Sequence, residues 1–194
     1  LSFRSADDEL VISASGAKLD ELAPADLVAC SISGAELKGA GGRPSKELPL
    51  HRAVYRARPG AQAVLHAAPF HATLAACSDI DVPDGLFVEA MYYLERVARV
   101  PYQHPGSEAL GAAVGEHARW ADVLLLENHG VVVLDESLDE ALQALQVLEL
   151  ASRMVLGAKA AGITLRPLPP ETANDFRTRS AYKPRRSWPE EGPT

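Results

Sequence analysis

Residues 122–161 read DVLLLENHGVVVLDESLDEALQALQVLELASRMVLGAKAA, and this stretch decides the expected fold. Two short apolar runs on either side of Asn128-His129-Gly130 have the length and composition of strands. A long run of helical period follows at 137–161, where Ser137 and Glu140 have the spacing of a capping box. Short buried strands next to a long helix predict an α/β layered domain.

The rest of the chain continues this alternation between apolar runs and segments of helical period. Strands are expected at 9–13, 26–32, 61–66, 97–101, 122–127 and 131–134. Helices are expected at 46–58, 70–77, 107–118 and 137–161. The buried face of the last helix is expected to consist of Leu138, Leu142, Leu145, Leu148 and Val155.

Length and composition suggest one domain with a small-molecule site. The chain has 194 residues, of which 47% are hydrophobic, which suffices for a single full core. Its net charge of −7 disfavours nucleic acid and anionic membranes as partners, because both attract a positive surface. No stretch approaches the ~20 apolar residues of a membrane helix. Only two cysteines are present, Cys30 and Cys77, so we expect buried thiols and a reducing cytoplasm.

The C-terminal part differs in composition from the rest. After Gly162 the sequence becomes rich in proline, and residues 183–194 are strongly charged. We expect this last segment to be a surface arm or a frayed tail, with Arg185 and Arg186 in solvent.

Three histidines could carry chemistry. His66 ends a strand-like run, His71 follows on the next turn, and His129 lies between two apolar strands. Imidazole is the commonest neutral ligand of Zn²⁺, and the ends of neighbouring strands can bring such ligands together. Spacing alone leaves plain hydrogen bonding open as the alternative for all three.

A second polar cluster, Arg43-Pro44-Ser45-Lys46-Glu47, leads into an expected helix. Free N–H groups at a helix start favour an anion such as phosphate. Ser45 is the expected N-cap and Lys46 a nearby cation, while Glu47 could complement the helix dipole or act as a base beside a metal. A capped helix without further function is the alternative, as a simple polar turn is for Ser13-Ala14-Ser15-Gly16.

Taken together, the motifs resemble one known family in their order and spacing. The matching segments are Ser15-Gly16, Leu22–Val28, Arg43–Glu47, Leu50-His51, Tyr55–Pro59, Ala63–His66, Pro101-Tyr102, Pro105–Ser107 and Asn128–Gly130. This pattern is similar to the class II aldolase and adducin head family, in particular its L-fuculose-phosphate aldolase-like members, over roughly residues 1–160. The opening Leu1–Arg4 resembles the segment that follows an N-terminal helix and turn in this family, so we expect part of the domain to be missing.

The resemblance implies a three-layer α/β/α sandwich with a central, mostly antiparallel mixed sheet. It places the domain at residues 1–165 and a C-terminal extension at 166–194. It also implies a cyclic homotetramer and a divalent metal, normally Zn²⁺, held by histidines. In such enzymes the metal polarises a sugar phosphate and stabilises an enediolate after carbon–carbon cleavage. Related members decarboxylate, dehydrate or epimerise their substrates through the same intermediate.

Individual positions can be carried over from the resemblance. His66 and His129 correspond to metal ligands and Glu47 to the acid/base, while Ser15, Gly16 and Ser45 correspond to phosphate-binding positions. Three positions depart from the pattern. Ala68 replaces a ligand histidine, Phe87 stands where a tyrosine is expected, and Lys46 replaces a serine.

These departures have opposite implications for function. Glu47, His66 and His129 could form a two-histidine, one-carboxylate site, with His71 or Glu89 completing the shell. Lys46 would strengthen anion binding or point to solvent. The first hypothesis is therefore a metal-dependent lyase acting on a small sugar or sugar phosphate. The alternative is an inactive, adducin-like member used for ligand binding or assembly, which Ala68 and Phe87 favour.

Overall fold

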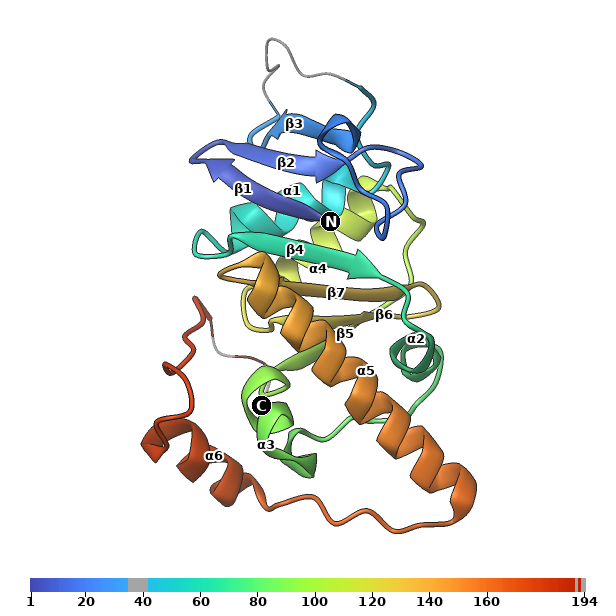
Figure 1. Cartoon of the computed structure of the whole chain (residues 1–194), viewed down its shortest axis with the longest axis vertical. Coiled ribbons are helices and arrows are strands. Elements are labelled where there is room, and N and C mark those ends of the chain that lie inside the picture. Colours follow the sequence, from blue (N-terminus) through green and yellow to red (C-terminus); the bar gives the residue numbers. More distant parts are fainter. Residues whose placement is uncertain (35–41, 191, 193–194) are drawn as a thin grey trace.

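The computed structural model describes residues 1–34, 42–190 and 192, and its elements form three layers (Figure 1). A seven-stranded sheet in the order β3-β2-β1-β4-β7-β6-β5 separates two layers of helices. Neighbouring strands are antiparallel except β5 and β6, which are parallel. The expected α/β/α sandwich with a mostly antiparallel mixed sheet is confirmed.

The strands are β1 (Ser2–Ala6), β2 (Glu9–Ser13), β3 (Leu27–Ser31), β4 (Ala63–Ala67), β5 (Val97–Val100), β6 (Val123–Leu126) and β7 (Gly130–Asp135). The helices are α1 (Leu48–Ala57), α2 (Phe70–Ala76), α3 (Val88–Tyr93), α4 (Glu108–Ala118), α5 (Leu138–Ala161) and α6 (Pro170–Arg179). Two short 3₁₀ turns are η1 (Pro24–Asp26) and η2 (Asp84–Leu86). Within the described residues, no helix is both long and apolar enough to cross a bilayer.

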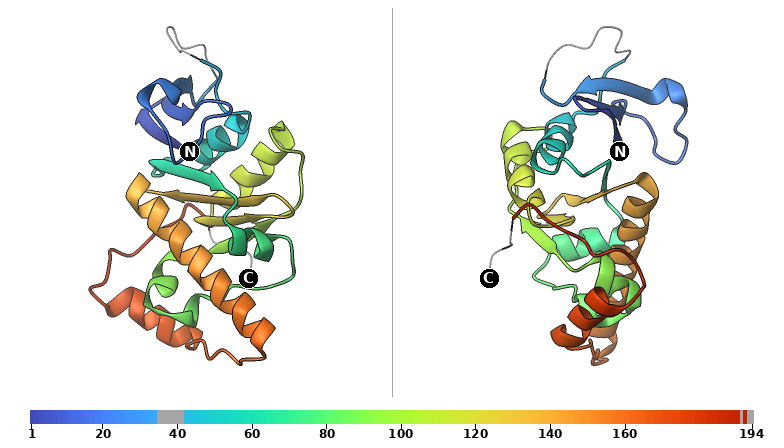
Figure 2. Two further views of the ribbon diagram at one scale, coloured as in Figure 1. Left: turned by 45° about the vertical axis from the view of Figure 1, so that its right-hand side comes forward. Right: turned by 90° about the vertical axis from the view of Figure 1, so that its left-hand side faces the viewer.

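Each face of the sheet has its own apolar core. Helices α1 and α4 cover one face, and α2, α3 and α5 cover the other (Figures 1 and 2). Alternating side chains of β4 enter opposite cores, since Val64 packs with α1 and Leu65 with α5. This alternation matters for function because His66 must therefore face the same side as Val64.

Every strand and helix expected from the sequence is present within a few residues of its predicted bounds. Three elements were not predicted: β1, α3 and α6. The strand β1 contains Arg4 and two serines and has little apolar character of its own, yet it pairs on both sides, with β2 and β4. Pairing between neighbours, which local sequence does not reveal, makes this segment a strand.

The predicted buried face of α5 is only partly correct. Leu138 and Leu142 are 38% and 46% exposed, whereas Ala141, Ala144 and Ala151 are buried against the sheet. Small alanine side chains allow the helix to lie close to the strands, so the leucines beside them are left at the surface. Of the five predicted residues, Leu148 is fully buried, Leu145 is half-buried against the core, and Val155 is half-buried.

Two smaller expectations are also corrected. Ser137 caps α5 by accepting a hydrogen bond from the Glu140 N–H at 3.1 Å. The reciprocal half of the capping box is not formed, because the Glu140 carboxylate binds the Tyr93 hydroxyl and the Lys183 ammonium instead. Cys30 is buried as expected, but Cys77 is exposed at the end of α2.

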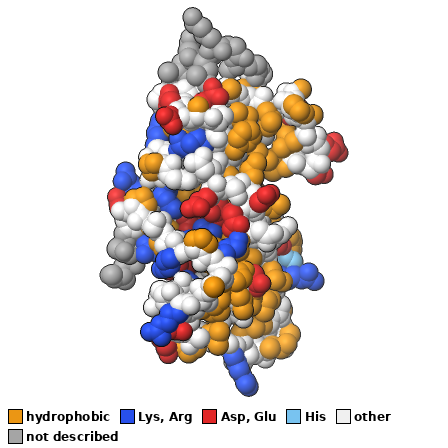
Figure 3. Space-filling model, turned by 60° about the vertical axis from the view of Figure 1, so that its left-hand side comes forward, with side chains coloured by type: hydrophobic (Ala, Val, Ile, Leu, Met, Phe, Trp, Pro, Cys, Tyr) orange, Lys and Arg blue, Asp and Glu red, His pale blue; other side chains and the backbone are white. Residues whose placement is uncertain are grey.

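Residues 183–190, which we call the C-terminal strap, lie against the domain, so the expectation of a solvated tail is wrong for Arg186, whereas Arg185 is exposed as expected. Arg186 lies between two buried carboxylates, with Nη2 2.7 Å from Asp135 Oδ2 and Nη1 3.2 Å from Asp122 Oδ2. Trp188 Nε1 donates to Asp122, and Arg185 pairs with Glu95. Acidic and basic side chains gather at mid-height on this face of the molecule (Figure 3). The strap therefore neutralises carboxylates at the end of the sheet where β6 begins and β7 ends.

Candidate metal centre

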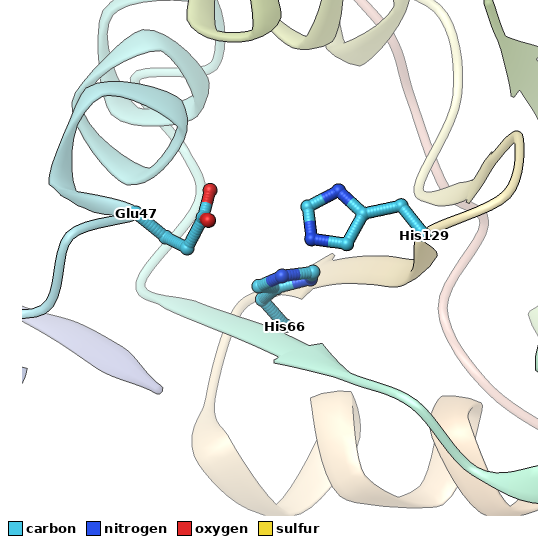
Figure 4. Close-up of side chains that lie close together, drawn as sticks. All are labelled: Glu47, His66 and His129. Atoms are coloured by element: carbon cyan, nitrogen blue, oxygen red, sulfur yellow. The ribbon is translucent and has the colours of Figure 1, made fainter. Parts of the chain in front are cut away.

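Three separate elements bring Glu47, His66 and His129 together. Glu47 immediately precedes α1, His66 is the penultimate residue of β4, and His129 lies in the turn between β6 and β7. The three side chains converge on a common space (Figure 4). Each offers one ligand atom, and these atoms all lie within 4.8 Å of one another. The imidazole rings meet nearly edge to face, with centroids 4.8 Å apart.

The backbone around His129 is specialised to bring the two histidines close. Asn128 adopts a left-handed conformation with φ of 54°, which asparagine tolerates better than most residues. At Gly130 a Cβ would lie only 2.7 Å from the carbonyl oxygen of Ala67, so only glycine fits without a shift. The Asn128-His129-Gly130 motif thus lets the turn approach the end of β4 closely.

The hydrogen bond made by Nδ1 of His66 leaves Nε2 of the same ring free to bind a metal ion. Nδ1 lies 3.0 Å from the Val131 carbonyl oxygen, and because that oxygen can only accept, Nδ1 carries the proton. Nε2 then has a free lone pair, and its orientation is fixed by the backbone of β7. Burial lowers the pKa of His66, which favours the neutral imidazole that binds metals.

His129 and Glu47 are also suited to binding a cation. Nδ1 of His129 is buried and has no hydrogen-bond partner among the described residues, an uncommon state that a metal ion bound at that nitrogen, or a substrate contact, would relieve. Glu47 Oε2 accepts the backbone N–H of Gly106 at 3.2 Å, which holds the carboxylate at the edge of the group. Two neutral imidazoles and one carboxylate are a donor set suited to a divalent transition metal.

The predicted anion-binding residues lie on adjoining segments. The Ser45 N–H donates to the Ser13 carbonyl at 3.1 Å, and the Ser15 N–H donates to the Arg43 carbonyl at 2.9 Å. Gly16, with φ of 86°, turns the chain next to Ser15. Glu47, not Ser45, is the N-cap of α1, and the Ser45 hydroxyl accepts the Glu47 N–H. Lys46 is exposed beside this junction.

Two residues suggested as extra ligands do not join the group. His71 is committed to Glu149 through a 2.7 Å contact, and Glu89 is exposed in the first turn of α3. Ala68 is exposed next to Gly130. Its Cβ lies 3.6 Å from the place that a Cβ at position 130 would occupy. The supporting contacts from Gly106 and the Val131 carbonyl were not predicted, because backbone groups carry no sequence signal of their own.

Known proteins resemble this chain along most of its length. The sequence matches the family described as Class II Aldolase and Adducin N-terminal domain over residues 1–156. It is 31% identical to 3-oxo-tetronate 4-phosphate decarboxylase of Pectobacterium atrosepticum, covering 80% of this chain and 72% of that protein. It is 33% identical to L-fuculose phosphate aldolase of Methanococcus vannielii, covering 74% and 76%.

The fold is also similar to that of solved structures. The crystal structure of YgbL from Klebsiella pneumoniae superposes with a TM-score of 0.78 at 29% identity, covering 90% of this chain and 84% of that one. The family match spans β1 to most of α5 and includes all three residues of the candidate metal centre. Sequence and fold together show that the chain belongs to the class II aldolase and adducin N-terminal domain family.

Proposed function

We propose that the chain is a divalent-metal-dependent lyase that breaks a carbon–carbon bond in a small sugar phosphate or sugar-acid phosphate. The observation that carries the proposal is the convergence of Glu47, His66 and His129. The named relatives are sugar-phosphate aldolases and decarboxylases, and both reactions leave negative charge on the same type of carbon framework. An aldol cleavage releases an aldehyde, whereas a decarboxylation releases carbon dioxide.

The residues have distinct proposed roles. His66 and His129 hold the metal, which we propose to be Zn²⁺, through their imidazoles. When bound, the ion supplies Lewis-acid polarisation of substrate oxygens and stabilises the charge left by bond cleavage. Glu47 moves a proton between a substrate hydroxyl or carbon and its own carboxylate, or else it contributes a third ligand. The Gly106 N–H orients that carboxylate.

The phosphate is proposed to bind at the junction of Ser15, Gly16 and Ser45. These residues lie on two segments that are joined by hydrogen bonds from the Ser15 and Ser45 N–H groups, so the hydroxyls of both serines can contact one anion. Lys46, exposed beside Ser45, adds positive charge for the same group.

The adducin-like, non-catalytic alternative gains no support from the comparisons, because the relatives matched carry enzyme names. A structural role also gives no reason for two imidazoles and a carboxylate to converge, with one imidazole nitrogen buried and without a partner in the described part of the chain. Assembly as a homotetramer in the cytoplasm remains part of the proposal. Light scattering coupled to size exclusion tests the assembly, and a monodisperse monomer would contradict it.

The first test is elemental analysis of the purified protein and of His66→Ala. We expect about one equivalent of a divalent transition metal in the wild type and its loss in the variant. His117→Ala is the matched control, because its Nδ1 also contacts a backbone carbonyl, that of Ala113. The loaded protein is then assayed with L-fuculose 1-phosphate for aldehyde release and with 3-oxo-tetronate 4-phosphate for carbon dioxide release. Absence of metal after incubation with Zn²⁺, Mn²⁺ and Co²⁺ would contradict the proposal.

Ala68→His should tighten metal binding by restoring a third imidazole beside Gly130. We expect Zn²⁺ affinity to rise at least about 10-fold, equivalent to about 1.4 kcal/mol. Competition with a chromophoric chelator measures the change. Ala67→His is the control, since residue 67 faces the opposite side of β4 and its imidazole cannot join the group. Equal affinities for the two variants would place the position of Ala68 outside the metal shell.

A further inference from the structure

A buried polar network links the elements that carry two of the three candidate ligands. Ser2 Oγ lies 2.7 Å from His51 Nδ1 and 3.0 Å from the Tyr55 hydroxyl. All three side chains are almost fully buried, at 0%, 1% and 2% exposure. A purely apolar contact would fill this space without the cost of removing polar groups from water, so the network has a role to explain.

The first link runs along α1 to Glu47. His51 and Tyr55 follow Glu47 at intervals of four residues, so the three residues share one side of the helix. The His51 N–H also donates to the Glu47 carbonyl, which makes Glu47 part of the first helical turn. Any movement of His51 relative to the sheet therefore moves Glu47 as well.

The second link runs across the sheet to His66. Ser2 pairs directly with Val64 of β4, so these two side chains face the same side, toward α1. His66, two residues beyond Val64, faces that side too. The hydrogen bond between Ser2 and His51 thus ties the helix that carries Glu47 to the strand pair that carries His66.

We propose that His51 is a positioning residue, held by Ser2 and Tyr55, that fixes Glu47 relative to His66 and thereby sets the metal affinity of the site. The inference rests on the proposed function, since it assumes that the three converging residues bind a metal. Removing hydrogen-bond partners of metal ligands typically changes metal affinity by about 10- to 100-fold, and we expect the lower end here because the His51 side chain acts on Glu47 through the helix backbone.

The test uses Co²⁺ alone as the probe, measuring its dissociation constant and its visible absorption spectrum in the full chain. We expect Ser2→Ala and His51→Phe each to weaken Co²⁺ binding by about 10-fold or more and to change the spectrum. Because both variants break the same hydrogen bond, the double variant should show no further loss. Ser152→Ala is the matched control: this serine is also fully buried, but it lies on α5 on the other side of the sheet.

The outcomes separate the two ideas. If Ser2→Ala and His51→Phe both keep the Co²⁺ affinity and spectrum of the wild type, as Ser152→Ala is expected to, the positioning role is overturned while metal binding is left intact. A wild type that binds no Co²⁺ would overturn the proposed function and this inference with it. If Ser2→Ala does not fold, His51→Phe decides alone, because phenylalanine keeps a buried ring in the same space and its thermal melt verifies folding.

Discussion

Glu47→Gln is expected to reduce turnover by about 10²- to 10⁴-fold, the range attributed to a positioned acid or base. Glutamine keeps the shape of the side chain and an oxygen that can still accept the Gly106 N–H, so the loop that carries Gly106 should stay in place. We therefore expect the free energy of unfolding to change by less than about 1 kcal/mol. Steady-state kinetics on the sugar phosphate identified in the assays, together with a thermal melt, measure both quantities.

The same variant distinguishes the two roles proposed for the carboxylate. If Glu47 only moves protons, the variant retains its metal and loses turnover. If Glu47 is a permanent ligand, metal and turnover are lost together. Glu108→Gln is the control, because Glu108 is an exposed glutamate in the first turn of α4 and should change neither. Undiminished turnover in Glu47→Gln would remove this residue from the mechanism.

Arg186→Gln is expected to destabilise the fold by about 3–5 kcal/mol, the range for removing one partner of a buried ion pair. The Arg186 side chain is 11% exposed, and those of Asp122 and Asp135 are each 5% exposed. Asp122 keeps Arg58 at 2.8 Å, but among the described residues Asp135 has no other basic partner. Denaturant unfolding measures the loss, provided that the transition remains two-state.

Two further variants make this result specific. Arg179→Gln removes an arginine whose side chain is 81% exposed and paired within its own helix, so a change below about 0.5 kcal/mol is expected. Asp135→Asn combined with Arg186→Gln should recover part of the lost stability, since it removes the unpaired carboxylate. A change in Arg186→Gln as small as that in Arg179→Gln would mean that the strap is not held by its charges.

The sequence predicted the strands and helices with strong apolar patterns, and through the family resemblance it identified Glu47, His66 and His129. Their convergence could be anticipated because strand ends and a helix start have defined places in this fold. Local pattern alone could not reveal β1, whose pairing partners are distant in the sequence. It also misled for α5, because a leucine stripe and an alanine stripe follow the same helical period and only the distance between helix and sheet decides which is buried.

The contacts of Arg186 show the same limit of reasoning from sequence. A charged, proline-rich terminal segment has the composition of disordered chain. Nothing in its own sequence reveals that Arg186 forms ion pairs with Asp122 and Asp135, which lie some fifty or more residues earlier. Expectations based on composition fail where a charge is complemented by a residue far along the chain. The roles of Ser15, Gly16, Ser45 and Lys46 stay predictions until a phosphate ligand is tested.

The strap lies outside the residues that the family model matches. The match to the family model ends at residue 156, before the strap begins, yet Arg186 pairs with two aspartates inside the matched region and is the one basic partner of Asp135 among the described residues. A chain shortened to the residues that the family model matches would retain every candidate metal ligand while leaving those aspartates without Arg186. For this protein, the matched residues are therefore fewer than the residues whose charges neutralise one another in the fold.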